Sequence, residues 1–205
     1  MPCFVAGTKI LTEAGWKNVE ELVVGDRLKI ASGDFKPIRW IGQKTLSPEV
    51  LSDNPQLRPI RIQSGALGEN TPKDDLIVSP QHRIVVRSTI SERMFGPIDV
   101  LVSAKRLLDL RGIDVVTDEA PVAYYHVLLD AHEVIFANGA RTESLLAGPE
   151  AMRAMGDALR EEIESLLPDA FDAAQTWHSS HVVPSKKKQS HLVGRHVKNN
   201  KFVCG

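Results

Sequence analysis

Residues 3–12 read CFVAGTKILT: a cysteine and a phenylalanine, then Gly-Thr, then a β-prone run. The chain has two cysteines, Cys3 and Cys204, near opposite ends and without CxxC spacing. Neither a disulfide framework nor a zinc site therefore explains the cysteine at position 3. A cysteine thiolate is a strong nucleophile, and the carbonyl just before it lies within geometric reach. Attack by Cys3 on that carbonyl would move the acyl group from nitrogen to sulfur and turn the amide into a thioester.

Such an acyl shift needs a pre-positioned amide, a proton for the leaving nitrogen and hydrogen-bond donors for the oxyanion. A histidine is the natural proton donor, because its pKa lies near neutrality. His82 meets this need, since it ends the turn Ser79-Pro80-Gln81-His82 between two strand-like runs. Ser79 could orient its imidazole or hydrogen-bond the scissile carbonyl. By spacing alone, an ordinary polar turn is the simpler interpretation of these residues.

Short β-prone runs alternate with turn signals from Lys9 to about Val134. Runs this short and this closely spaced predict a compact all-β fold of many short strands. A tight turn is expected at Asn138-Gly139, and one or two helical turns at 103–110. The predicted strands lie at 9–12, 16–19, 27–30, 37–42, 58–62, 76–78, 83–86, 100–102, 122–129 and 133–137.

The part of the chain after residue 147 loses the strand pattern. Residues 148–168 carry apolar side chains at three- and four-residue steps between Pro149 and Pro168, which predicts an appended amphipathic helix. Residues 169–205 are basic and rich in histidine, and their last 30 residues lose all periodicity. We therefore expect three parts: an all-β body over 1–147, the helix, and a disordered tail.

Charge is distributed unevenly along the chain. Residues 176–205 hold six of the 25 Lys and Arg and no acidic residue, which leaves 19 basic and 26 acidic residues in the remainder. An acidic body gives little reason to expect nucleic-acid binding, and three consecutive lysines at 186–188 are few.

Neither a membrane span nor a signal peptide is apparent in the sequence. No apolar run reaches the roughly 18–20 residues that cross a bilayer. The N-terminus lacks the basic segment and apolar core of a signal peptide. The compartment stays open between the cytoplasm and secretion without a cleavable signal peptide.

Four blocks, in family order, resemble the Hint domains of hedgehog C-terminal regions and inteins. The first is residues 3–12, and the second is EELVVGDRL at 20–28. The third is SPQH at 79–82, with Ser79 where the family usually has threonine, and the fourth runs from 125 to 139 and ends in FANG. Together they span residues 3 to about 147. The resemblance implies a Hint fold and an autoprocessing activity.

The resemblance also implies a role for each matching residue. Cys3 would take the acyl group, His82 would protonate the departing amide nitrogen, and Ser79 would support both. His126 stands where many relatives have an aspartate, and its alternative is a strand side chain facing a polar layer. Asp130 and His132 lie nearby and could act as a general base or as an orienting pair.

Splicing inteins end the late block in His-Asn followed by Cys, Ser or Thr, whereas here Asn138-Gly139 leads into Ala140. The resemblance is therefore to a bacterial, hedgehog-like Hint module that cleaves at its N-terminal side without splicing. Its substrate would be the bond between Pro2 and Cys3 in its own flanking polypeptide. Water or a small external nucleophile would finish the reaction in a monomer without metal or cofactor.

Two alternatives remain open. One is a Hint fold without activity that serves as an interaction or secretion-associated module, which the substitutions at Ser79 and His126 favour. The other is a metal site formed by histidines of the tail, although they lack a helical i, i+4 frame and lie in a polar tract. These histidines are His178, His181, His191 and His196.

Overall fold

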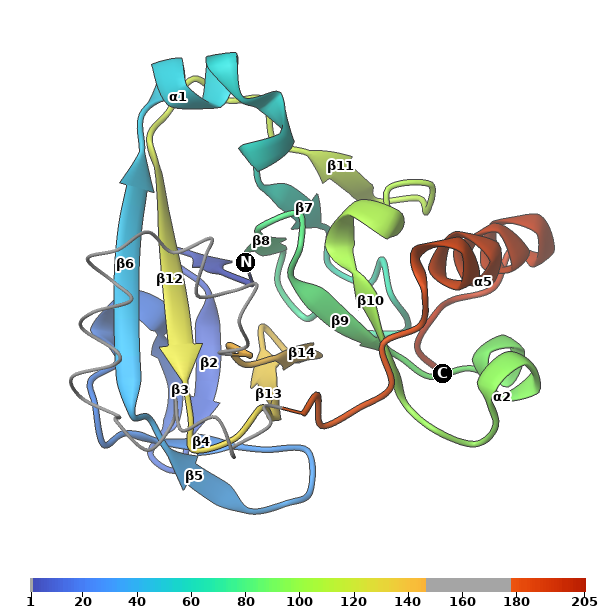
Figure 1. Ribbon diagram of the computed structural model, residues 1–205, viewed down its shortest axis with the longest axis horizontal. Helices are drawn as coiled ribbons and strands as arrows, with labels where there is room; N and C mark the ends of the chain where they lie inside the picture. The colour runs from blue at the N-terminus through green and yellow to red at the C-terminus, as the bar shows by residue number, and fades with distance from the viewer. Residues whose placement is uncertain (1, 147–177) are drawn as a thin grey trace.

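The computed structural model describes residues 2–146 and 178–205, which form two antiparallel sheets with short helices at their margins (Figure 1). The first sheet has the strand order β11 (Ile113–Val115), β7 (Ile60–Ile62), β8 (Leu76–Val78), β1 (Phe4–Val5), β12 (Val122–Leu128) and β6 (Trp40–Leu46). The second has the order β10 (Val100–Ser103), β9 (Arg83–Val86), β14 (Ala140–Glu143), β13 (Val134–Ala137), β2 (Lys9–Thr12), β4 (Arg27–Lys29) and β5 (Phe35–Pro37), with β3 (Gly15–Asn18) paired to β2. The all-β expectation is confirmed.

Strand alternation explains how both sheets contribute to one core. In β7, Ile60 and Ile62 are buried and Arg61 between them is half-buried, as expected for a strand with one face inward. Ile10 of β2 and Ile84 of β9 bring the second sheet into the same apolar cluster. The predicted strands at 76–78 and 83–86 match β8 and β9 to the residue.

The turn between β13 and β14 confirms the expectation for Asn138-Gly139. Both residues have positive φ, 46° and 84°, and Ala137 pairs with Ala140 across the turn. A two-residue hairpin of this kind needs residues that tolerate the left-handed region, which Asn and Gly do. The hairpin brings Glu143 of β14 back beside β13.

The helices of the body are short and are capped by serines. α1 (Pro48–Asp53) begins after Ser47, and α2 (Thr89–Phe95) after Ser88. The region 103–110 contains a single 3₁₀ turn over Ala104–Arg106, with others at Val19–Glu21 and Pro55–Leu57. Among the described residues, no helix is long and apolar enough to cross a membrane.

The prediction of a disordered tail is wrong over residues 178–205. Lys186–Asn199 form α5, which lies beside β10 and α2 at the C-terminal end (Figure 1). Its buried face comprises Gln189, Leu192, Val193 and His196, a three- and four-residue spacing hidden in a polar composition. The predicted helix at 148–168 lies outside the described residues.

The tail is joined to the body by backbone and side-chain contacts on both sides of α5. Before the helix, the Leu101 amide donates to the Val182 carbonyl at 2.9 Å, which extends the sheet at β10. After it, the Cys204 amide donates to the Leu67 carbonyl at 2.8 Å, and Val203 joins the main core. Residues 178–205 are therefore part of the folded unit.

Candidate functional site

Cys3 directly precedes β1, which lies between β8 and β12 in the first sheet. Phe4 pairs with Tyr125 on one side and with Val78 on the other. Because neighbouring strands run antiparallel, the residue before Phe4 lies opposite the residues that follow its two partners. This register places Cys3 between His126 and Ser79.

Ser79 holds the peptide nitrogen of Cys3. The Cys3 amide donates to Ser79 Oγ at 3.0 Å, and the Ser79 amide donates to the Cys3 carbonyl at 3.0 Å. The serine thus contacts the nitrogen side of the Pro2–Cys3 bond, whereas the sequence suggests the imidazole of His82 or the scissile carbonyl as its target. This contact fixes the amide that an acyl shift would break.

His126 faces the carbonyl oxygen of Pro2 and the sulfur of Cys3. Its Nδ1 lies 2.9 Å from the Pro2 carbonyl oxygen and its Nε2 lies 3.5 Å from Cys3 Sγ. Burial lowers the pKa of His126 to about 4, so the ring is neutral near pH 7 and carries one proton. A carbonyl can only accept, which places this proton on Nδ1 and leaves the lone pair of Nε2 toward the thiol.

A tryptophan on the neighbouring strand backs the His126 ring. The rings of Trp40 and His126 are nearly parallel, at 17°, with centroids 6.5 Å apart. Gly42 pairs with His126 across β6 and β12. A Cβ added at Gly42 would lie 2.0 Å from the Trp40 ring, so only glycine leaves room for this arrangement.

Cys3 is buried and protonated. Burial raises the pKa of its thiol to about 12, against a smaller opposing effect of Ser79. The sequence suggests a nucleophile of modest pKa, but the structure holds a neutral thiol. A thiol in this state would need a neighbouring base to act as a nucleophile, and Nε2 of His126, 3.5 Å from the sulfur, is a base within reach.

His82 lies inside the core behind β1. Its ring centroid is 4.5 Å from that of Phe4, and neither ring nitrogen makes a hydrogen bond of ordinary geometry to a described residue. Burial lowers the pKa of His82 to about 4, while Glu143 and the Cys3 backbone favour its charged form. The full burial of this side chain against Phe4 sets it apart from the exposed histidine of an ordinary polar turn.

Two other predicted residues lie outside this cluster. Asp130 is exposed and forms a two-pronged ion pair with Arg39. His132 is buried, but its Nε2 lies 3.1 Å from Glu143 and its Nδ1 lies 3.0 Å from the Ser180 amide. The structure thus gives both residues hydrogen-bond partners other than Cys3.

The tail histidines do not form a metal site in the structure. His196 is buried against Ser88 and Lys201, and His181 contacts Ser180. Within residues 2–146 and 178–205, no three His, Cys, Asp or Glu side chains gather as metal ligands.

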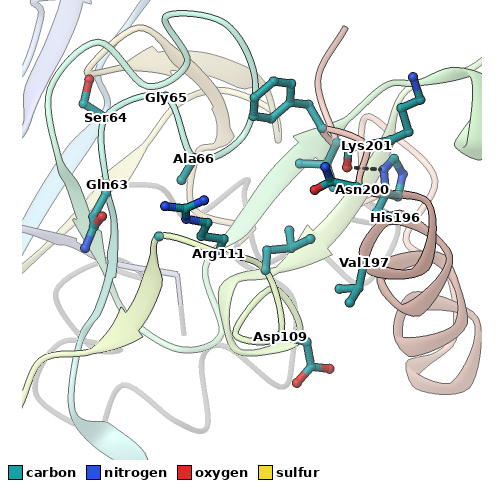
Figure 2. A pocket seen from close by; sticks show the side chains of 14 residues that line it. Gln63, Ser64, Gly65, Ala66, Asp109, Arg111, His196, Val197, Asn200 and Lys201 are labelled. Atoms are coloured by element: carbon teal, nitrogen blue, oxygen red, sulfur yellow. Dashed lines mark hydrogen bonds between the residues drawn. The ribbon is translucent and has the colours of Figure 1, made fainter.

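A largely apolar cavity of about 500 Å³ lies beside Cys3. Cys3, Ser79 and His126 form part of its wall, together with Lys44 and Lys105. A second cavity of about 570 Å³ lies where α5 meets the body, lined by residues such as Gln63, Arg111 and Asn200 (Figure 2). Only the first gives access to Cys3.

A model of the Hint domain family matches residues 2–149. The chain belongs to the Hint domain family. The match includes Cys3, Ser79 and His126 and leaves residues 150–205 outside. A Hint domain of this family has the hedgehog and intein fold that the four sequence blocks resemble, and that family connection indicates an autoprocessing or splicing capability.

Solved structures of similar shape are inteins and intein-like domains. The bacterial intein-like domain of Clostridium thermocellum is 16% identical, with 71% of this chain and 99% of that chain covered and a TM-score of 0.48. The DnaB intein of Synechocystis sp. PCC 6803 is 7% identical, with 71% and 99% covered and a TM-score of 0.43. A comparison with curated protein sequences finds no match.

Sequence reasoning missed Glu143 and the backing of His126 by Trp40. Glu143 is fully buried and binds Arg83 and His132. An acidic residue in a strand with buried neighbours is a signal that could have marked it, because a buried carboxylate needs partners.

Proposed function

We propose that this Hint domain cleaves the Pro2–Cys3 bond by an N-to-S acyl shift, followed by attack on the thioester, and that it does not splice. The observation that carries the proposal is the position of His126, whose two ring nitrogens face the scissile carbonyl oxygen and the attacking thiol. One side chain can thus activate the electrophile and the nucleophile together.

In the first step, the Cys3 thiol gives its proton to Nε2 of His126 as Sγ attacks the Pro2 carbonyl carbon. Negative charge develops on the carbonyl oxygen, where the Nδ1–H group of the newly formed imidazolium stabilises it. Preorganisation favours this step, because the thiol and the imidazole are held at 3.5 Å before any charge moves.

In the second step, the bond from carbon to nitrogen breaks as His82 protonates the nitrogen of Cys3. The products are a thioester joining the Pro2 carbonyl to Sγ and a free amino group on Cys3. His126 gives up the proton that it took from the thiol, and His82, which is neutral before and after the step, takes up one proton as it passes one to the nitrogen. One proton has therefore moved from sulfur to nitrogen in total, and both imidazoles end neutral. Ser79 keeps the departing nitrogen in place through its hydrogen bond.

The thioester then lies against the cavity of about 500 Å³. Water or a small nucleophile entering there attacks the Pro2 carbonyl carbon, takes the acyl group and returns the thiol to Cys3. Because the wall of this cavity is largely apolar, the nucleophile that accepts the acyl group does not need to be charged.

The absence of splicing is supported by the state of Asn138. Its side-chain oxygen accepts the Lys9 amide at 2.7 Å, and its side-chain nitrogen donates to the Asp75 carbonyl at 2.7 Å. Both ends of the side-chain amide therefore hold the hairpin turn in place. An asparagine bound in this way is not free to cyclise on its own backbone.

A fusion with a small reporter domain directly before Pro2 tests the proposal. Intact mass spectrometry is expected to show the reporter released as a dithiothreitol thioester or as a hydroxamate after hydroxylamine. Cys3→Ala is expected to leave the fusion whole, and Cys204→Ala, which removes the other thiol, to cleave like the parent. A parent fusion that stays whole with both reagents contradicts cleavage and leaves an inactive interaction module.

The acyl shift is expected to be nearly independent of pH between about 6.5 and 9. Burial raises the pKa of Cys3 to about 12 and lowers that of His126 to about 4, so both stay neutral across this window. A free thiolate would instead give roughly a tenfold rise per pH unit. Cleavage rates measured across this pH range at saturating nucleophile distinguish the neutral thiol from a free thiolate. A steep rise of the rate with pH contradicts the role of His126.

The pH window stops at its acid end for a reason of stability. His82 and His126 have a pKa near 6.5 in the unfolded chain and about 4 in the fold. The unfolded chain therefore binds more protons as the pH falls from 6.5 toward 4, and the free energy of unfolding decreases in that range.

A further inference from the structure

We propose that Glu143 is a positioning residue that holds His82 ready to protonate the leaving nitrogen. The inference rests on the proposed function and adds a residue outside the cluster around the scissile bond. Glu143 lies at the end of β14, and none of its side chain is exposed. A buried carboxylate is costly unless several donors satisfy it.

Arg83, the residue that follows His82, supplies two of the hydrogen-bond donors to Glu143. One carboxylate oxygen accepts the Arg83 backbone amide at 2.8 Å, and the other accepts the Arg83 guanidinium at 2.8 Å. Glu143 thus binds the backbone at Arg83, the residue directly after His82. This contact, with that of the His82 amide to the Ser79 carbonyl at 3.0 Å, fixes the direction in which the His82 side chain leaves the backbone.

The charge of Glu143 also acts on the imidazole. His82 is fully buried, and its environment contains Glu143, Arg83 and the backbone of Cys3. Of the three ionised groups that act on it, the Glu143 carboxylate stabilises a protonated His82, and the Arg83 guanidinium and the terminal ammonium group of the chain oppose it. Burial leaves His82 neutral at rest, so the carboxylate acts on the charged form that His82 adopts while it passes a proton to the departing nitrogen.

His132 and the C-terminal segment hold Glu143 from its other side. The Ser180 amide donates to Nδ1 of His132 at 3.0 Å, which makes Nδ1 an acceptor and places the ring proton on Nε2. Nε2 then donates to Glu143 at 3.1 Å. A chain of hydrogen bonds therefore runs from Ser180 through His132 to the Glu143 carboxylate. Ser180 lies outside the family match, so the C-terminal segment helps to hold the residue that positions His82.

The test separates charge from packing by using two variants that break the same ion pair. In a Cys3→Ala background, which cannot cleave, the imidazole of His82 is titrated by nuclear magnetic resonance. Glu143→Gln is expected to lower the titration midpoint of His82, and Arg83→Gln to raise it. Glu143→Asp keeps the charge and is expected to restore a midpoint near that of the parent.

The matching arm measures cleavage of the reporter fusion with Cys3 present. Glu143→Gln is expected to slow cleavage about tenfold, a fraction of what general acid catalysis supplies, and Glu143→Asp to recover most of the rate. An unchanged His82 midpoint in Glu143→Gln, or shifts of the same sign in Glu143→Gln and Arg83→Gln, would overturn the inference. If Glu143→Gln does not fold, a lowered midpoint in Arg83→Gln also overturns it.

The two arms keep the inference apart from the proposed function. A parent fusion that stays whole rejects autoprocessing, while the titration in the Cys3→Ala background still shows whether Glu143 controls the protonation of His82. A parent fusion that cleaves, with a Glu143→Gln variant that cleaves equally fast, rejects the role of Glu143 alone.

Discussion

Replacing His126 by alanine in the reporter fusion is expected to lower the rate constant of cleavage by roughly 10³- to 10⁵-fold. General base catalysis contributes about 10²- to 10⁴-fold, and one donor to a developing oxyanion about 10²- to 10³-fold. One ring would supply both, since Nε2 faces the thiol at 3.5 Å and Nδ1 faces the Pro2 carbonyl at 2.9 Å. The expected loss is smaller than the product of the two factors, because contributions that act as a unit are not additive. The measurement is the rate of reporter release at saturating dithiothreitol.

A second substitution at the same position divides the two contributions. His126→Asn can keep an amide donor near the Pro2 carbonyl but offers no base to the thiol, so its loss is expected to be smaller than that of alanine. His191→Ala, on the exposed face of α5, serves as the histidine control and is expected to cleave at the parent rate. A His126→Ala variant within tenfold of the parent would show that another group activates Cys3.

The other large effect concerns stability. Leu192→Ala is expected to lower the free energy of unfolding by about 2–5 kcal/mol, because it empties a fully buried site between α5 and the body. Val197→Ala is the matched control on the same helix. Val197 is 48% exposed, and its truncation is expected to cost less than about 1 kcal/mol.

Urea unfolding followed by tryptophan fluorescence measures both variants. Two of the three tryptophans, Trp16 and Trp40, lie in the sheets of the body, so their fluorescence reports on the unfolding of the body. A lower midpoint with an unchanged slope for Leu192→Ala shows that α5 unfolds with the sheets. Equal midpoints for Leu192→Ala and Val197→Ala would mean that the tail contributes nothing to the stability of the fold.

The strands and the candidate nucleophile, Cys3, can be predicted from the sequence because they depend on local signals. Leu76–Val78 and Arg83–Val86 are short β-branched runs with a Pro-containing turn between them, and Asn138-Gly139 is a turn by its chemistry alone. Cys3 stands out because no disulfide or metal explains it. These features need no knowledge of what lies across the sheet.

The contacts of His126 could not be predicted in the same way. Its contacts depend on the register of β1 against β12, which joins residues more than 120 positions apart. The choice between His126, Asp130 and His132 is a choice of register, because a shift of one residue reverses the face of every side chain. Composition likewise concealed α5, whose buried face includes Gln189 and His196 as hydrogen-bonded polar residues.

The place of β1 between β8 and β12 has a consequence for the order of events during synthesis. A ribosome makes Cys3 first, and makes the strand that carries His126 more than a hundred residues later. Until β12 has emerged and joined β1, the Pro2–Cys3 bond has neither its base nor its oxyanion donor. Under the proposed mechanism, a chain that stalls before β12 would keep any polypeptide upstream of Cys3 attached, and cleavage would show that translation has passed that point.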